Sequence, residues 1–344
     1  MAQNRPPKSD HRESGLMQRM RNSVRVRGVP EPHVLLACSG GKDSVALAWI
    51  LAELRRLNLL TFSIAHIHHG QHDRAESAAE AVLEIGVRLD APVSIHRLKA
   101  DDIESHKGVG LEEAMRRERY LTLAGIANES DAECIALAHH QIDQAETILL
   151  HLMRGTGLDG LVGMREWERR TIPWWVETGP HVDIDIWRPL ITEAAADVAG
   201  IASESCLPIV EDPTNIDTAW RRNAIRHQLL PVLESIAEGS TAAIARSANL
   251  VSEDFDLLES VTANALTRCQ VKKQLSRAEL VQLHPALQAR IARRWLLDQL
   301  PTLDLSADRV NAVVNLARRN RGGALVEIGS GHHVTLKNGL LSLD

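Results

Sequence analysis

The sequence predicts an α/β protein in which a doubly wound parallel sheet is followed by a smaller, mainly helical domain. Over roughly the first 210 residues, short apolar runs alternate with amphipathic segments of helical spacing, the pattern of βαβ units. A glycine turn follows the first apolar run, where a parallel sheet binds its ligands. Beyond residue 219 the apolar residues recur almost entirely at helical spacing, which indicates a second domain.

In chain order, we expect a short basic amphipathic helix at 16–26 and then alternating strands and helices. The expected strands cover 34–38, 61–66, 93–98, 134–138 and 183–187, and the helices cover 45–57, 76–89, 111–128, 143–154 and 193–206. The stretch 167–180 has no clean periodicity and indicates an insertion or a hairpin. Because the carboxyl ends of parallel strands meet at one edge, the loops after the first four strands should share a cleft.

The second domain should contain helices at 223–236, 240–268, 276–282, 285–299 and 306–318, with a terminal hairpin at 326–328 and 333–336. We therefore divide the chain into a tail with a basic helix at 1–30, the α/β domain at 31–218 and the accessory domain at 219–344. No internal repeat is evident.

Composition narrows the class of protein. Apolar residues make up 44% and charged residues 24%, as in globular proteins. No apolar run approaches the ~20 residues of a membrane span, and the N-terminus lacks a secretion signal, so we expect a cytoplasmic protein with no membrane partner. The cysteines form no C-x-x-C pair, which disfavours zinc, iron–sulfur and disulfide scaffolds. They are Cys38, Cys134, Cys206 and Cys269.

The net charge of −6 hides an uneven distribution. Residues 265–321 hold eleven Lys or Arg against four Asp or Glu, and the first thirty residues hold seven against two. Local basic faces favour binding to a phosphate backbone more than the total charge does. Solvated helix faces explain each cluster equally well when it is taken alone.

The glycine turn is Ser39-Gly40-Gly41-Lys42-Asp43-Ser44. A strand, a glycine turn and a helix together present unpaired N–H groups and the positive end of a helix dipole to a phosphate. Asp43 would repel that phosphate unless a cation lay between them, which favours Mg²⁺. An ordinary βα turn is the alternative. The six residues resemble the pyrophosphate-binding loop of the N-type ATP pyrophosphatases, which split ATP between its α- and β-phosphates.

A second polar cluster follows the fourth expected strand. His139, Asp143 and Glu146 are spaced i, i+4, i+7 and share one helix face. Two carboxylates and an imidazole there could bind Mg²⁺, hold an ammonium group or transfer a proton. Alternatively, Asp143 begins an ordinary surface helix and His139 is satisfied in the core. A site rich in carboxylates without a nearby Cys suits a hard cation better than zinc.

Two arginine clusters leave two interpretations open. Arg116 and Arg119 lie one turn after Glu112, which suits either a salt-bridged helix or an Arg that reaches phosphate or RNA. Arg222 lies in a basic helix start at 221–226, whose arginines could grip phosphate or clamp two domains together.

Six segments, taken in order, resemble the motifs of the tRNA(Ile)-lysidine synthetase family, over most of residues 30–235. They are Ser39–Ser44, Arg116–Tyr120, His139–Thr147, Arg154–Leu161, Arg188–Leu190 and Glu211–Arg226. Two departures stand out. Ile142 replaces one of two adjacent acidic residues, and His69-Gly70-Gln71-His72 replaces the family's usual His-Gly-Leu-Arg.

The resemblance implies an adenine nucleotide alpha hydrolase-like fold and a two-step ligation that uses ATP and Mg²⁺. In the first step, the O2 carbonyl of the cytidine at the first anticodon position of a tRNA(Ile) with a CAU anticodon attacks the α-phosphate of ATP and releases pyrophosphate. In the second step, L-lysine displaces AMP at C2 and forms lysidine. The sequence leaves a homodimer open as the assembly.

The resemblance also implies roles for individual residues. Loop 39–44 would bind pyrophosphate, and Asp43 with Asp143 would hold the metal. Asp143 and Glu146 would hold and deprotonate lysine. His139, Arg119 and Arg222 would contact the phosphate or the activated base.

Two other classes of protein remain as rivals. One is a different ATP pyrophosphatase, such as a thiolation enzyme or an amidotransferase-coupled synthetase. The lack of a C-x-x-C pair and of room for an amidotransferase domain opposes it. The other is a non-catalytic RNA-binding protein, which would not need Asp43, Asp143 and Glu146 together.

Overall fold

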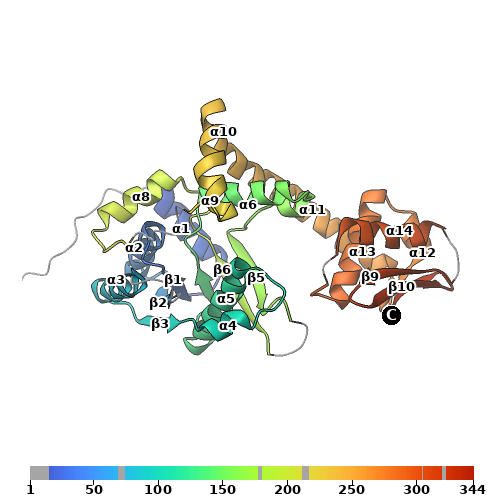
Figure 1. The fold of residues 1–344 in the computed structure, drawn as a ribbon, viewed down its shortest axis with the longest axis horizontal. Coiled ribbons are helices and arrows are strands. Elements are labelled where there is room, and N and C mark those ends of the chain that lie inside the picture. Colours follow the sequence, from blue (N-terminus) through green and yellow to red (C-terminus); the bar gives the residue numbers. More distant parts are fainter. Residues whose placement is uncertain (1–14, 69–73, 177–179, 211–216, 304, 320–322) are drawn as a thin grey trace, which may run out of the picture. The chain divides into compact units, whose positions relative to one another are not determined.

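The computed structural model describes residues 15–68, 74–176, 180–210, 217–303, 305–319 and 323–344 (Figure 1). The chain forms two compact units. The first comprises Met1–Pro173 and His181–Val251, and the second comprises Trp174–Pro180 and Ser252–Asp344.

The first unit is built on a six-stranded sheet of order β3-β2-β1-β4-β6-β5. The β3-β2-β1-β4-β6 pairs are parallel and β5 is antiparallel to β6, which confirms the predicted parallel-dominated α/β class. The central strand β1 pairs Leu35 with Ser63 on one side and with Ile135 on the other. The strands are β1 His33–Ala37, β2 Thr61–His68, β3 Val93–Arg97, β4 Cys134–Ala136, β5 Trp167–Ile172 and β6 Val182–Trp187.

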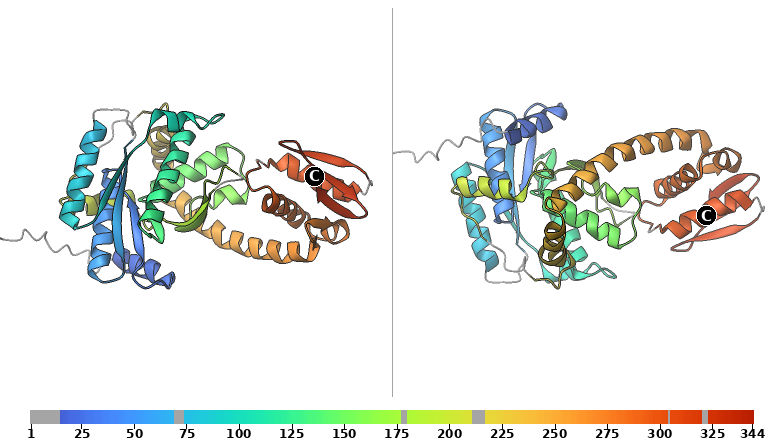
Figure 2. Two further views of the ribbon diagram at one scale, coloured as in Figure 1. Left: turned by 90° about the horizontal axis from the view of Figure 1, so that it is seen from below. Right: turned by 90° about the horizontal axis from the view of Figure 1, so that it is seen from above.

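Helices cover both faces of this sheet. α2 and α3 lie on one side of the strands and α5 on the other, and α8 and α1 pack against α2 (Figures 1 and 2). The helices are α1 Gly15–Val26, α2 Lys42–Arg56, α3 Arg74–Leu89, α4 Ala100–Glu104, α5 Leu111–Glu129, α6 Gln141–Met153, α7 Leu158–Leu161 and α8 Ala195–Glu204. This alternation of strand and helix matches the sequence periodicity nearly element for element.

β1 and α2 supply much of the apolar core of the unit. Leu35 and Leu36 of β1 are fully buried between the helical layers, as parallel strands covered on both faces must be. Leu47, Ile50 and Leu54 of α2 are also buried, because α2 contacts the sheet and the helices α1, α3 and α8. The start of α2, and with it the glycine turn, is therefore held firmly in place.

The stretch at 167–180 contains β5, the first strand of a hairpin whose second strand is β6. β5 and β6 pair antiparallel from Trp167 with Trp187 to Ile172 with Val182. The Trp167 and Trp187 rings stack with their centroids 5.1 Å apart. The hairpin interpretation is confirmed, and it adds an antiparallel edge strand to the sheet.

The first unit continues past residue 218, where the sequence placed the domain boundary, and ends at Val251. The physical reason is a small apolar cluster in which Ile225 and Leu230 pack with Ala145 and Leu150 of α6. Residues 221–236 therefore belong to the first unit by contact. They form α9 Arg221–Ala224, the π-helix η3 Ile225–Leu229 and α10 Leu230–Ile236.

The second unit combines helices with a five-stranded antiparallel sheet of order β7-β8-β11-β10-β9. The predicted hairpin is confirmed as β9 and β10, whereas β7, β8 and β11 were not expected. The described elements are the C-terminal part of α11 Ser240–Cys269, α12 Arg277–Val281, α13 Pro285–Gln299, α14 Ala307–Arg319, β7 Gln270–Val271, β8 Gln274–Ser276, β9 Leu325–Gly329, β10 His332–Lys337 and β11 Leu340–Leu343. Within the described residues, no helix is long and apolar enough to span a membrane.

Trp295 is the largest side chain in the core of the second unit, at 1% exposed, and its indole N–H donates to the Lys273 carbonyl at 2.8 Å. Replacing Trp295 with Ala should destabilise this unit by about 3–5 kcal/mol, because it leaves a cavity and an unpaired carbonyl. Urea unfolding followed by circular dichroism measures the change. Leu257→Ala is the control, since Leu257 is 66% exposed. Equal effects of the two substitutions would contradict this packing.

Candidate active site

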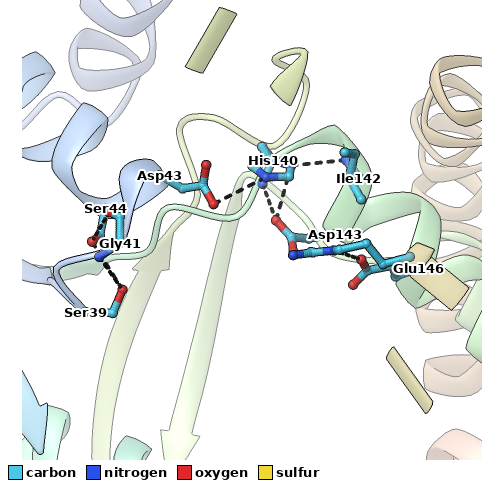
Figure 3. Close-up of polar contacts among 9 residues, drawn as sticks. Ser39, Gly41, Asp43, Ser44, His140, Ile142, Asp143 and Glu146 are labelled. Carbon is cyan, nitrogen blue, oxygen red and sulfur yellow. Dashed lines mark hydrogen bonds and ion pairs between the residues drawn. The ribbon is translucent and has the colours of Figure 1, made fainter. Parts of the chain in front are cut away.

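The glycine turn joins β1 to α2 and presents bare backbone donors. α2 begins at Lys42, and its N-cap Gly41 makes no side-chain cap hydrogen bond. Gly40 has φ +86°, a conformation that L side chains rarely adopt. Ser39 accepts a hydrogen bond from the Gly41 N–H at 3.3 Å, and Ser44 donates to the Gly41 carbonyl at 2.9 Å (Figure 3). The turn is thus ordered by its own serines and leaves a helix N-terminus open for an anion.

Asp43 projects from the first turn of α2 toward α6. Its Oδ2 lies 3.5 Å from Nε2 of the buried His140 (Figure 3). Its Oδ1 is buried and has no hydrogen-bond partner within the described residues. A buried carboxylate oxygen without a donor is costly unless a cation or a ligand satisfies it. Asp43 therefore fits a role as a metal ligand.

His140 is the N-cap of α6 and forms a reciprocal capping box with Asp143. Its ring Nδ1 accepts from the Ile142 N–H at 3.2 Å, and its backbone N–H donates to Oδ2 of Asp143 at 2.8 Å. Burial lowers the pKa of His140, but the hydrogen bond to Asp43 and the charges of Asp143 and Asp43 outweigh burial and raise it. The imidazole therefore lies between two carboxylates, one from each side of the site.

Arg226 joins the two acidic side chains of α6. It donates from Nη2 to Oδ1 of Asp143 at 2.7 Å and from Nε to Oε1 of Glu146 at 2.5 Å. The guanidinium comes from the π-helix η3, a distortion often found at functional sites. One cation thus neutralises the half-buried Asp143 and the buried Glu146 only in part.

Arg226 lowers the pKa of both carboxyl groups, but their net pKa shifts have opposite directions. Burial raises the pKa of Asp143, but His140, His139 and Arg226 together bring it below its usual value. Burial raises the pKa of Glu146 more than Arg226 lowers it, so the Glu146 pKa ends above its usual value. Asp143 is therefore the firmly ionised member of the pair, and Glu146 is the member better suited to accept a proton.

His139 faces a group of arginines. Burial lowers its pKa to about 4; the charge of Asp143 opposes this shift, whereas Arg188, Arg222 and Arg119 lower the pKa further. Its Nδ1 is buried and has no partner in the described chain. A neutral imidazole within electrostatic reach of three guanidinium groups lies in a positively charged environment suited to an anion.

The arginines of α5 divide between the two interpretations of that helix. Arg116 pairs with Glu113 at 3.3 Å, as a salt-bridged helix predicts. Arg119 makes no ion pair within the described residues. Its side chain is exposed, but desolvation by neighbouring protein atoms lowers its pKa, and the nearby charges of Arg116 and Arg222 lower it further. Arg119 is therefore available to an anion.

The structure brings most of the predicted site residues to one edge of the sheet. Asp43, Asp143 and Glu146 are linked through His140 and Arg226, and His139 lies within electrostatic reach of Arg119 and Arg222. Sequence reasoning chose His139 from the adjacent pair and gave no role to His140. The two departures from the family motifs differ in outcome. The Ile142 N–H donates to the His140 cap, whereas residues 69–72 lie outside the described residues. The segment 211–215 also lies outside them.

Comparison with known proteins defines the class first. A family model described as a PP-loop domain matches residues 12–233, and one described as the TilS substrate binding domain matches residues 275–340. The fold of the U34-tRNA thiolase NcsA from Methanococcus maripaludis superposes with a TM-score of 0.52 at 17% identity, covering 69% of this chain and 80% of that one. The chain is thus a PP-loop, ATP-using protein.

Curated relatives then specify the family. The tRNA(Ile)-lysidine synthase of Bordetella parapertussis is 33% identical over 86% of this chain and 83% of its own length. Those of Dehalococcoides mccartyi and Xanthomonas campestris are 29% and 34% identical, over 89% and 79% of this chain, which spans 66% and 59% of their lengths. The chain belongs to the tRNA(Ile)-lysidine synthase family of PP-loop ligases, which confirms the resemblance found in the sequence.

The lowered pKa of His139 makes a prediction about stability. In the folded state its pKa is about 4 instead of 6.5, so the unfolded chain takes up a proton at this position first as the pH falls. The His139 contribution to stability should therefore be lost between pH 6.5 and about 4. His139→Gln should flatten the dependence of the free energy of unfolding on pH across this window, as measured by urea unfolding. The control is the exposed His96→Gln, and equal slopes in the two variants would contradict a neutral His139 imidazole in the folded state.

Proposed function

We propose that this chain ligates L-lysine to C2 of the cytidine at the first anticodon position of a tRNA(Ile) with a CAU anticodon, through an adenylated tRNA. The observation that carries the proposal is the link Asp43–His140–Asp143, which joins the phosphate turn to the carboxylate pair. One site thereby holds a place for a nucleotide phosphate next to a place for an amine. Membership of the tRNA(Ile)-lysidine synthase family supports this reading.

In the first half-reaction the cytidine O2 attacks the α-phosphate of ATP and pyrophosphate leaves. The turn 39–44 would hold the pyrophosphate through backbone N–H groups and the positive end of α2. His139, Arg119 and Arg222 would stabilise the negative charge on the adenylate phosphate.

The Asp43 carboxylate fits Mg²⁺, which when bound would neutralise charge on the leaving phosphates. Asp143 fits a metal less well in this arrangement, because Arg226 and the His140 N–H already occupy its two oxygens. Within the described chain, no group of three or more His, Cys, Asp or Glu side chains could hold a metal. An ion at Asp43 would therefore complete its shell with phosphate oxygens and water, as Mg²⁺ usually does.

In the second half-reaction the lysine amine attacks C2 and AMP leaves. Asp143 and Glu146 carry two carboxylates against the one guanidinium of Arg226, which favours binding of a further cation such as an ammonium group. The amine must lose a proton before it attacks. The raised pKa of Glu146 suits it to take that proton, and the ionised Asp143 suits it to hold the substrate.

The accessory region would bind the tRNA. The substrate-binding family model covers residues 275–340, within the second unit. Lys272 and Lys273, just before this region, and Lys337 within it are exposed in the structure. We propose salt-sensitive contacts from this basic surface to the phosphate backbone.

Incorporation of labelled lysine tests the proposed reaction directly. The purified chain with ATP and Mg²⁺ should transfer label to a tRNA(Ile) transcript with a CAU anticodon. A tRNA(Met) transcript, which carries the same anticodon, is the matched control for tRNA choice, and labelled arginine is the control for amine choice. Consumption of ATP without lysine transfer to the tRNA(Ile) transcript would refute the proposal.

A further inference from the structure

The turn at 188–193 connects β6 to the segment before α8 and carries part of the site. Its first residue, Arg188, is buried and contributes to the charge around His139. Its last residue, Glu193, accepts a hydrogen bond at its backbone carbonyl from the N–H of Gln141, the first residue of α6, at 3.1 Å. The position of this turn therefore sets where α6 begins.

The helix α1 contacts both ends of this turn. Arg19 donates from Nε and Nη2 to the two carboxylate oxygens of Glu193, at 2.9 and 2.6 Å. One helical turn later, Ser23 accepts at 3.0 Å from the indole N–H of Trp187, which directly precedes the turn. Arg19 and Ser23 share one helix face, so α1 holds the turn at two points.

These contacts are of a kind that fixes geometry. A bidentate pair between guanidinium and carboxylate restricts both distance and orientation. Glu193 is only 5% exposed, so its carboxylate depends on Arg19 for compensation of its charge. The neighbouring face of α1 is anchored in the core through Met17, Met20 and Val24.

We infer that Arg19 is a positioning residue for the amine-binding end of the site, acting through Glu193 on the first turn of α6. This inference rests on the proposed function for its kinetic consequence, whereas the structural coupling stands without it. It also changes the reading of α1, whose basic side chains the sequence assigned equally to RNA or to solvent. Arg19 and Arg27 are engaged with Glu193 and Asp185 of the same unit.

Amide hydrogen exchange of the full-length chain tests the coupling without an activity assay. Arg19→Ala should speed exchange at the Gln141 N–H and the first turn of α6 about tenfold. Exchange at the start of α2 should stay within about twofold of the native protein. Arg25→Ala, an exposed arginine on the same helix, is the matched control and should change neither.

Kinetics then separate positioning from general stability. In lysine ligation, Arg19→Ala should raise KM for lysine about tenfold and leave KM for ATP within about twofold. Arg19→Lys should recover part of the loss, because one charged hydrogen bond remains. Glu193→Gln should behave like Arg19→Ala, and the double variant should be no worse than either single one, because both remove the same contact.

The outcomes are distinguishable. Unchanged exchange at α6, or equal changes in α2 and α6, would overturn the coupling. Faster exchange at α6 with the same kinetics as Arg25→Ala would overturn the positioning role. If exchange at α6 is faster in Arg19→Ala but the native protein transfers no lysine, the coupling is supported and the proposed function is refuted instead.

Discussion

The contact of His140 with Asp43 is the interaction on which the geometry of the site depends. Asp43 belongs to the helix that begins the phosphate turn, and His140 caps the helix that carries the two carboxylates. This contact joins the two halves of the site directly. The buried imidazole suits this task because Nδ1 accepts from the Ile142 N–H at the start of α6 while Nε2 faces Asp43.

Charge balance around α6 follows from that arrangement. Three carboxylates converge on one guanidinium and one imidazole, and burial makes each uncompensated charge costly. The result is a division of properties between neighbours, with Asp143 held ionised and the pKa of Glu146 raised. On the other side, His139 stays neutral among arginines. An anionic phosphate and a cationic amine therefore each find a complementary environment.

The sequence predicted the sheet, most helices and the glycine turn because these depend on local periodicity and on residues close together in the chain. It missed β11 although Asn338-Gly339, with φ values of 50° and 76°, is a recognised two-residue hairpin turn. The sequence could not predict which side chains pair across long distances in the chain. Arg226 lies 80 residues from Glu146, and Arg19 lies 174 from Glu193, so no spacing rule connects them. The choice between His139 and His140 likewise depended on which ring faces Asp43.

The division of labour between the phosphate turn and the carboxylate pair is tested most directly by measuring the two half-reactions separately. We expect Glu146→Gln to adenylate the tRNA, and so release pyrophosphate from ATP, at nearly the native rate. Lysine transfer by this variant should fall about 100-fold or more, because a proton acceptor is lost. Asp43→Ala should lose pyrophosphate release and lysine transfer together while still binding tRNA. If Glu146→Gln lost pyrophosphate release as completely as lysine transfer, the two halves of the site would not have the separate roles assigned to them.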